Sequence, residues 1–318
     1  MAALTLNRKG ETAATDAIMK SLFERSINHP ELGRYWKQNK GYFWHETPVE
    51  SQALLIEAFE ALTKDRNAVD EMRTWLLAQK QTHRWPGSRA TAEAVYALLL
   101  RGTDWIASSK PVNISVGGVA LDNAQAEAGT GYISRRWDGT EVTPGLANIS
   151  MHNPNQHPAW GGAYWQYFAP IDILNAHSTS LRLRKEVFLE KPGQSEIVLV
   201  PAGGQRIETG SRVRVRLIIE TDRNMEYVHL KDYRAAAFEP LNVLSGYKVQ
   251  GGLAFYESTR DASTDFFIPY LARGKYVFEY SLVATQKGNF ANGHATIQCL
   301  YAPEFAARSE GGRVVVGK

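Results

Sequence analysis

The spacing of apolar residues changes near residue 108, and this change limits what the chain can fold into. Before it, apolar residues recur every three or four positions, which is typical of amphipathic helices. After it they alternate with polar residues, which is typical of strands with one buried face. No strand–helix–strand alternation occurs, so we predict a multidomain α plus β protein in which helical hairpins precede antiparallel β-sandwiches.

Four helices are predicted, at about residues 14–28, 48–63, 65–80 and 88–100. Thr47 and Glu50 fit a capping box at the second helix, and Asp65 and Ser88 are candidate caps of the next two. Short links favour antiparallel neighbours and therefore stacked hairpins. In the last helix the predicted inward face is Ala92, Val95, Tyr96, Leu99 and Leu100.

Alternating runs predict strands at about residues 112–116, 181–189, 212–219, 275–283 and 294–301. The β part is about twice as long as one sandwich needs, so it is expected to divide. The predicted domains are a helical domain at 1–107, a β segment at 108–178 and a sandwich at 179–318. The outward arginines of the 212–216 run are interpreted as a solvated face.

Composition excludes several functions. The 318 residues carry a formal net charge of +3, too small and too dispersed to predict a nucleic-acid partner. No apolar run approaches the roughly 20 residues that cross a bilayer, and residues 1–10 lack the features of a signal peptide. Cys299 is the only cysteine, so an intrachain disulfide is impossible and a zinc site is not expected. It alternates with the inward residues of its strand, which predicts a buried thiol.

Catalytic motifs are weak, and we expect no enzyme, no catalytic residue, no cofactor and no metal. Ser245 and Lys248 fit a serine acyl-enzyme pattern, but Gly246 argues against the helix that this pattern needs. His152 and His157 share one loop without an evident third metal ligand. His229 and Asp232 lie three apart in a strand, which places them on opposite faces.

Large aromatic residues concentrate in the loops of the helical part. Tyr35, Trp36, Trp44 and Trp85 form a candidate groove for a peptide or a glycan, which makes a binding module the alternative function. The other interpretation is that these rings wedge helix ends together. Titrating tryptophan fluorescence with ligands distinguishes the two.

A dense series of segments resembles the carboxy-terminal domain of bacterial alpha-2-macroglobulin-like proteins: Asp222–Asp232, Phe238–Tyr247, Tyr256–Asp261, Gly274–Tyr280 and Leu300–Glu304. Upstream, Trp85–Gly102 resembles the last helices of that family's thioester-type α/α toroid. Gly129–Tyr132 and Trp160–Tyr167 resemble its CUB-like β segment. The expected order is therefore a partial toroid, a CUB-like segment and the last macroglobulin-like sandwich.

The resemblance implies the carboxy-terminal part of an exported endopeptidase inhibitor in the periplasm or cell envelope. Its implied partners are upstream domains of the parent protein and target proteases. The family's Cys-x-Glu-Gln thioester motif does not occur, because Leu300, Tyr301 and Ala302 follow the single cysteine. Leu300 stands where thioester-bearing members have a shielding Met, so Leu300 and Tyr301 are candidate docking residues. The alternative is that Leu300 is merely a residue on the second face of its strand.

Overall fold

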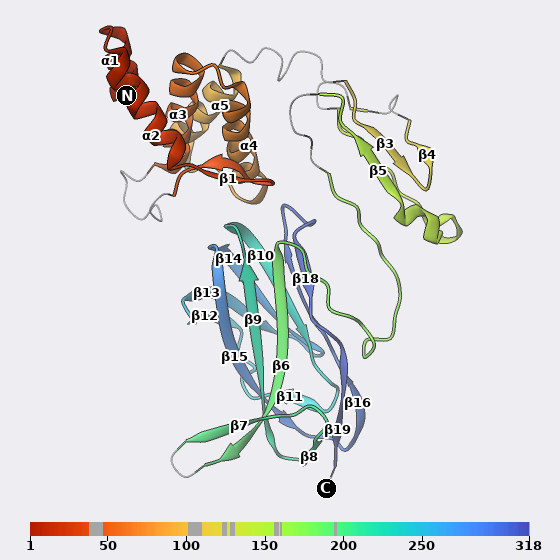
Figure 1. Ribbon diagram of the computed structural model, residues 1–318. Coiled ribbons are helices and arrows are strands. Elements are labelled where there is room, and N and C mark those ends of the chain that lie inside the picture. The colour runs from red at the N-terminus through yellow and green to blue at the C-terminus, as the bar shows by residue number, and fades with distance from the viewer. Residues whose placement is uncertain are drawn as a thin grey trace. The chain divides into compact units, whose positions relative to one another are not determined.

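The computed structural model describes residues 1–37, 47–100, 110–122, 126–127, 131–155, 159, 161–193 and 196–317. The chain divides into two compact units, residues 1–80 with 85–161 and residues 81–84 with 162–318. Helices come first and antiparallel sheets follow, which confirms the predicted fold class (Figure 1). None of the helices in the described ranges is long and apolar enough to span a membrane. The finer domain boundaries remain predictions.

The first unit opens with five helices: α1 (Ala2–Arg8), α2 (Thr12–Glu24), α3 (Pro48–Leu62), α4 (Arg66–Thr82) and α5 (Gly87–Leu99). The sequence prediction missed α1 and extended α2 beyond its observed end at Glu24. Residues Ile27–His29 instead form β1, paired with β2 (Gly33–Tyr35). The ring nitrogen Nδ1 of His29 accepts the backbone N–H groups of Glu31 and Leu32, which closes this hairpin turn.

Only one of the three predicted helix caps is present. Asp65 Oδ1 accepts the backbone N–H of Ala68 at 3.1 Å, as predicted. Thr47 makes no side-chain cap bond, so the capping box is wrong. The Ser88 cap is also wrong, because α5 begins one residue earlier and its N-cap is Pro86, which lacks a capping side chain.

Alanines, rather than larger residues, form the buried face of α5. Ala90, Ala94 and Ala97 are fully buried, and α5 packs against α3. The predicted inward face is wrong for Ala92, which is exposed, and for Val95, Tyr96 and Leu99, which are 42%, 51% and 47% exposed. Both stripes have helical spacing, but the small side chains let α5 approach its neighbour closely. Ile56, Phe59, Met72 and Leu76 complete the centre of this core.

The first unit also contains a small antiparallel sheet with the order β4-β3-β5. Its strands are β3 (Asn113–Val116), β4 (Val119–Ala120) and β5 (Ile149–His152). Gly117 and Gly118 connect β3 to β4 with φ values of 61° and 82°. Such positive φ values are unfavourable for residues that have a side chain. The strand expected at 112–116 is thus confirmed.

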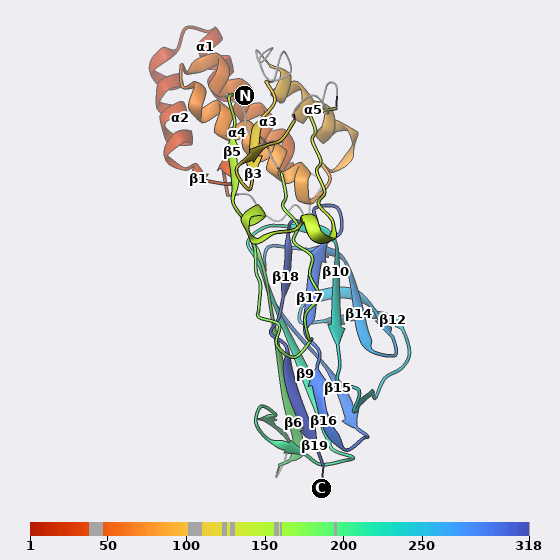
Figure 2. The same cartoon turned by 90° about the vertical axis from the view of Figure 1, so that its right-hand side faces the viewer.

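The second unit is an antiparallel sandwich (Figures 1 and 2). One sheet has the order β12-β13-β14-β10-β17-β18, formed by β10 (Met225–Tyr233), β12 (Gly246–Gln250), β13 (Leu253–Thr259), β14 (Ser263–Leu271), β17 (Ala295–Cys299) and β18 (Ala306–Arg308). The other has the order β11-β15-β9-β6-β7, formed by β6 (Leu181–Pro192), β7 (Ile197–Pro201), β9 (Arg212–Thr221), β11 (Phe238–Pro240) and β15 (Gly274–Ala284). A third sheet joins β8 (Arg206–Ile207), β16 (Gly288–Asn292) and β19 (Gly312–Val316).

Aromatic rings fill the space between the two large sheets. Phe255, Phe266 and Phe278 are buried, with ring centroids 5.0–5.5 Å apart. Tilted and edge-on ring pairs of this kind stabilise a core beyond the area they bury. The sandwich therefore presents its loops from a firmly packed body.

Two outward arginines of β9, Arg214 and Arg216, take part in ion pairs with neighbouring strands. Arg214 lies 2.8 Å from Glu190 and 3.3 Å from Glu279, and Arg216 lies 2.6 Å from Glu279. Nearby carboxylates thus balance the positive charge of Arg214 and Arg216. This arrangement agrees with a structural face rather than an anion-binding one.

Candidate docking site of the carboxy-terminal sandwich

The connection from β17 to β18 presents two large side chains to solvent. Leu300 is 52% exposed and Tyr301 is 75% exposed, whereas Ala302 and Phe305 are buried. The backbone N–H of Phe305 donates to Ala302 O, and the N–H of Cys299 donates to Phe305 O. The loop is therefore fixed by its own backbone and by a buried phenylalanine, while its tip stays accessible.

Tyr227 on β10 supports this tip. Its carbonyl oxygen accepts the backbone N–H of Leu300 at 3.0 Å, and its ring meets Tyr301 edge-on at 5.1 Å. Among the described non-glycine residues, only Tyr227 has a positive φ, 56°. Tyr227 on β10 and Pro269 on β14 are not among the paired residues of these two strands. Proline has no backbone N–H to donate to a neighbouring strand. Strained backbone of this kind persists where its surroundings hold it, often at functional sites.

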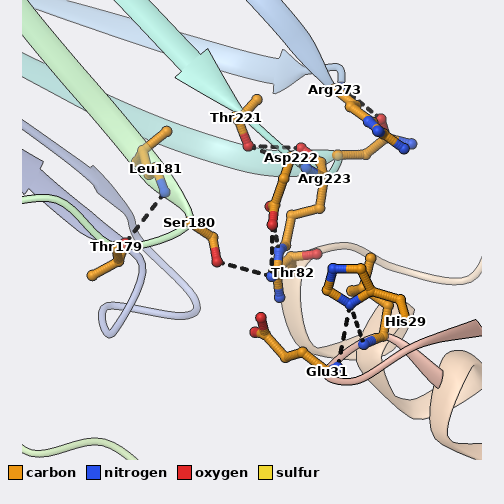
Figure 3. A network of polar contacts seen from close by, with 12 residues as sticks. His29, Glu31, Thr82, Thr179, Ser180, Leu181, Thr221, Asp222, Arg223 and Arg273 are labelled. Carbon is orange, nitrogen blue, oxygen red and sulfur yellow. Dashed lines mark hydrogen bonds and ion pairs between the residues drawn. The ribbon is translucent and has the colours of Figure 1, made fainter.

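Arg223 contacts the base of the same loop. Its guanidinium lies 2.8 Å from Asp222 Oδ1 and donates to Ser180 Oγ at 2.9 Å (Figure 3). It also stacks 4.7 Å from the ring centre of Phe305. Thr221 Oγ1 donates to the carbonyl oxygen of Arg223. Arg223 thus ties the turn between β9 and β10 to the start of β6 and to the loop after β17.

Cys299 is buried directly before Leu300, as predicted. Its thiol donates to Glu226 O at 3.5 Å, and burial raises the pKa of this thiol above its ordinary value. A raised pKa disfavours the reactive thiolate. Cys299 therefore contributes packing to the site rather than chemistry.

Of the three weak catalytic patterns, the two that lie wholly within the described residues do not assemble into sites. Asp232 is fully buried, and His229 lies on the other face of β10, as expected. His229 Nε2 instead contacts Asp265 Oδ1 at 2.8 Å across the β10–β14 ladder, a pairing 36 residues apart that no local pattern indicates. Lys248 lies in the strand β12 and contacts Glu257 at 2.7 Å. His152 lies in β5, and His157 lies outside the described residues.

The described rings of the candidate aromatic groove contact the helical core. Tyr35 stacks on Trp75 with ring centroids 6.2 Å apart. The indole nitrogen of Trp36 donates to Leu22 O at 2.8 Å, and that of Trp85 donates to Leu76 O at 3.1 Å. Trp44 lies outside the described residues. These contacts give the three rings a packing role, and a ligand groove stays a prediction.

Comparison with known families supplies the context for this sandwich. Residues 181–304 match the family model described as the bacterial alpha-2-macroglobulin MG10 domain. Among curated proteins, the "Circularly permutated Ras protein 2" of Dictyostelium discoideum is 26% identical over 208 residues. That match covers 62% of this chain and only 5% of the relative.

Solved structures of bacterial alpha-2-macroglobulins are similar over most of the chain. A trypsin-activated form from Escherichia coli has a TM-score of 0.43 and 13% identity, over 86% of this chain and 19% of that one. A Salmonella form reacted with methylamine has a TM-score of 0.38 and 16% identity, over 88% and 18%. The chain thus spans about a fifth of these proteins.

The family-model match begins with β6 and ends at Glu304, so it includes Tyr227, Arg223 and the exposed tip formed by Leu300 and Tyr301. The resemblance proposed from the sequence segments is confirmed. Residues 181–304 are thus similar to the MG10 domain of bacterial alpha-2-macroglobulins, and this match covers less than half of the chain.

Proposed function

We propose that this chain works as the carboxy-terminal part of a bacterial alpha-2-macroglobulin-like endopeptidase inhibitor, and that its role is mechanical rather than enzymatic. The MG10 match supports the type of protein. The exposed Leu300 and Tyr301, on a loop fixed from behind, support docking as the mode of action. The fixed loop is the observation that carries the proposal.

The physical reason is preorganisation. A loop that is already ordered loses little conformational entropy when it docks, so most of the burial energy contributes to association. Fully burying one large apolar side chain contributes about 1.5–3 kcal/mol. Burying the exposed parts of Leu300 and Tyr301 would therefore contribute a few kcal/mol to docking, little enough for a rearrangement to break the contact.

In the proposed mechanism the docked domains belong to a larger parent protein in the periplasm or cell envelope. Cleavage of the parent by a target protease lets its domains rearrange around that protease. Upstream domains of the parent and the attacking proteases are the proposed partners. This chain lacks a Cys-x-Glu-Gln motif, so it supplies no thioester for covalent capture.

Small-angle scattering of the native gene product tests the docking step. Leu300→Asp places a charge in the proposed docking surface, so the radius of gyration should increase as the docked domains of the parent separate. Val249→Asp is the matched control, because Val249 is 79% exposed on β12. An unchanged radius of gyration for Leu300→Asp would overturn the docking proposal.

A protease assay with the native gene product tests the inhibitory step. Trapping blocks access of large substrates while the active site of the protease stays intact. Cleavage of a protein substrate should therefore fall, while cleavage of a short chromogenic peptide continues. Equal activity on both substrates, with or without the product, would contradict the proposal.

A further inference from the structure

A lysine and an aspartate meet in the middle of the sandwich and play no part in the docking site. Lys185 Nζ lies 2.6 Å from Asp232 Oδ1, and the two side chains are 4% and 0% exposed. Lys185 lies on β6 in the five-stranded sheet, and Asp232 lies on β10 in the six-stranded sheet. The pair therefore spans the two layers.

Complete burial makes the charged form of this pair costly. The cost of removing an ammonium and a carboxylate from water can exceed the attraction between the two charges. Burial raises the pKa of Asp232, although the charge and hydrogen bond of Lys185 and the hydroxyl of Tyr280 act in the opposite direction. A shared proton can pass from Nζ to the carboxylate, which leaves a neutral amine beside a carboxylic acid.

Neighbouring groups hold both partners in place. Lys185 Nζ donates to Tyr233 O at 2.6 Å and to Gly293 O at 2.8 Å, which fixes the nitrogen against the carboxyl group. The hydroxyl of Tyr280 donates to Asp232 Oδ2. Burial and the charge of Asp232 raise the pKa of Tyr280 well above its ordinary value, so this hydroxyl keeps its proton.

We propose that Lys185 and Asp232 form an intramolecular isopeptide bond that joins β6 to β10. The amine nitrogen attacks Cγ of the protonated carboxyl group while Tyr280 stabilises the negative charge that develops on Oδ2. A C–N bond forms, the C–Oδ1 bond breaks, and Oδ1 leaves as water with a proton from the nitrogen. An ammonium and a carboxylate thus become one amide and one water, with no oxidant or activating group.

The proximity of Nζ to the carboxyl group accelerates formation of the amide. Fixed, well-oriented partners reach effective molarities of about 10⁵–10⁸ M. Exclusion of water from the core also disfavours the reverse hydrolysis. The amide keeps one N–H, which Tyr233 O or Gly293 O can accept.

A second pair in the same sandwich is an internal control. Lys248 Nζ lies 2.7 Å from Glu257 Oε1, nearly the same distance, but the Lys248 side chain is 35% exposed. Water solvates its ammonium and stabilises the charged form. We therefore expect Lys248 and Glu257 to remain an ion pair.

Mass spectrometry of the purified full chain tests the bond. The intact mass should be lower than the sequence mass by one water. A protease digest should contain one branched peptide that joins Lys185 to Asp232, with Lys248 and Glu257 in ordinary linear peptides. An intact mass equal to the sequence mass would overturn the proposal without any variant.

Two variants test the chemistry. Lys185→Met should restore the full mass. Tyr280→Phe removes the hydroxyl but keeps the ring, so freshly purified protein should contain an unreacted fraction that loses water about a hundredfold more slowly. Tyr276→Phe is its control, since that hydroxyl donates to Ala272 O instead. Water loss in Lys185→Met, or equal rates in Tyr280→Phe and wild type, would contradict the mechanism.

Discussion

Tyr301 rests edge-on against Tyr227, with ring centroids 5.1 Å apart and an interplanar angle of 82°. Tyr227 in turn has a backbone φ of 56°. The ring contact and the bond from Leu300 N–H to Tyr227 O connect a strained strand residue to an exposed loop. The exposed tip of the sandwich thus contacts a strained neighbour on β10.

The backbone of Tyr227 gives a first prediction. A left-handed conformation costs an ordinary residue about 1–2 kcal/mol, whereas asparagine tolerates it and a β-branched residue does not. Tyr227→Val should therefore be less stable than Tyr227→Asn by about 1 kcal/mol in urea unfolding. Both variants lose the ring, so equal stabilities would show that the left-handed conformation does not matter.

Arg223 gives a second prediction. Arg223→Ala removes its bonds to Ser180 and Asp222 and its stacking on Phe305, and should destabilise the sandwich by about 1–3 kcal/mol. The loss of the Asp222 contact contributes little to this destabilisation, because water screens the charge of the partly exposed Asp222. Arg184→Ala is the control, because Arg184 is 67% exposed and should change stability by less than about 0.5 kcal/mol. Equal effects of the two substitutions on the urea midpoint would contradict the pinning role.

His294 predicts how stability depends on pH. Burial is the largest cause that lowers the pKa of His294 in the folded state, and the charge of Arg308 acts in the same direction. As pH falls, the unfolded state therefore binds a proton at this histidine before the folded state does. The free energy of unfolding is highest above the ordinary histidine pKa and falls as pH decreases through it. The Nδ1 atom of His294 is buried without a hydrogen-bond partner in the described structure.

His294→Gln removes this titration. Its unfolding free energy should fall less than that of the wild type between neutral and mildly acidic pH, as measured by urea unfolding at several pH values. Identical slopes would show that His294 does not contribute to the acid sensitivity.

The exposed face of α5 predicts self-association. Val95, Tyr96 and Leu99 form an apolar stripe at helical spacing, each more than two-fifths exposed. Exposed apolar patches commonly mediate association. Sedimentation should show oligomers that increase with concentration, and Leu99→Lys should reduce them. A strictly monomeric profile at high concentration would contradict this prediction.

Local patterns predicted the elements whose signals lie within one segment. The apolar spacing of α3 and α4 and the alternation in β6, β9 and β15 match the observed elements closely. The cap at Asp65 was also predictable, because a capping side chain lies within three residues of the N–H that it accepts. The buried position of Cys299 followed from the same alternation.

Pairings between distant strands were not predictable in this way. Lys185 meets Asp232, and His229 meets Asp265, only because β6, β10 and β14 pack or pair in three dimensions. The positive φ of Tyr227 coincides with a gap in the β10–β14 ladder that also omits Pro269, and no single segment reveals this gap. Likewise, the choice of the alanine stripe of α5 over the larger one depends on how closely α3 approaches.

The central claim is that these 318 residues act as the carboxy-terminal part of a larger inhibitor. Mass spectrometry of the native gene product, isolated from its source cells before trimming, tests it most directly. We predict a product several times larger, with the peptides of this chain at its carboxy end. A mature product of only these 318 residues would contradict the account, because no upstream domains would remain for the sandwich to dock against.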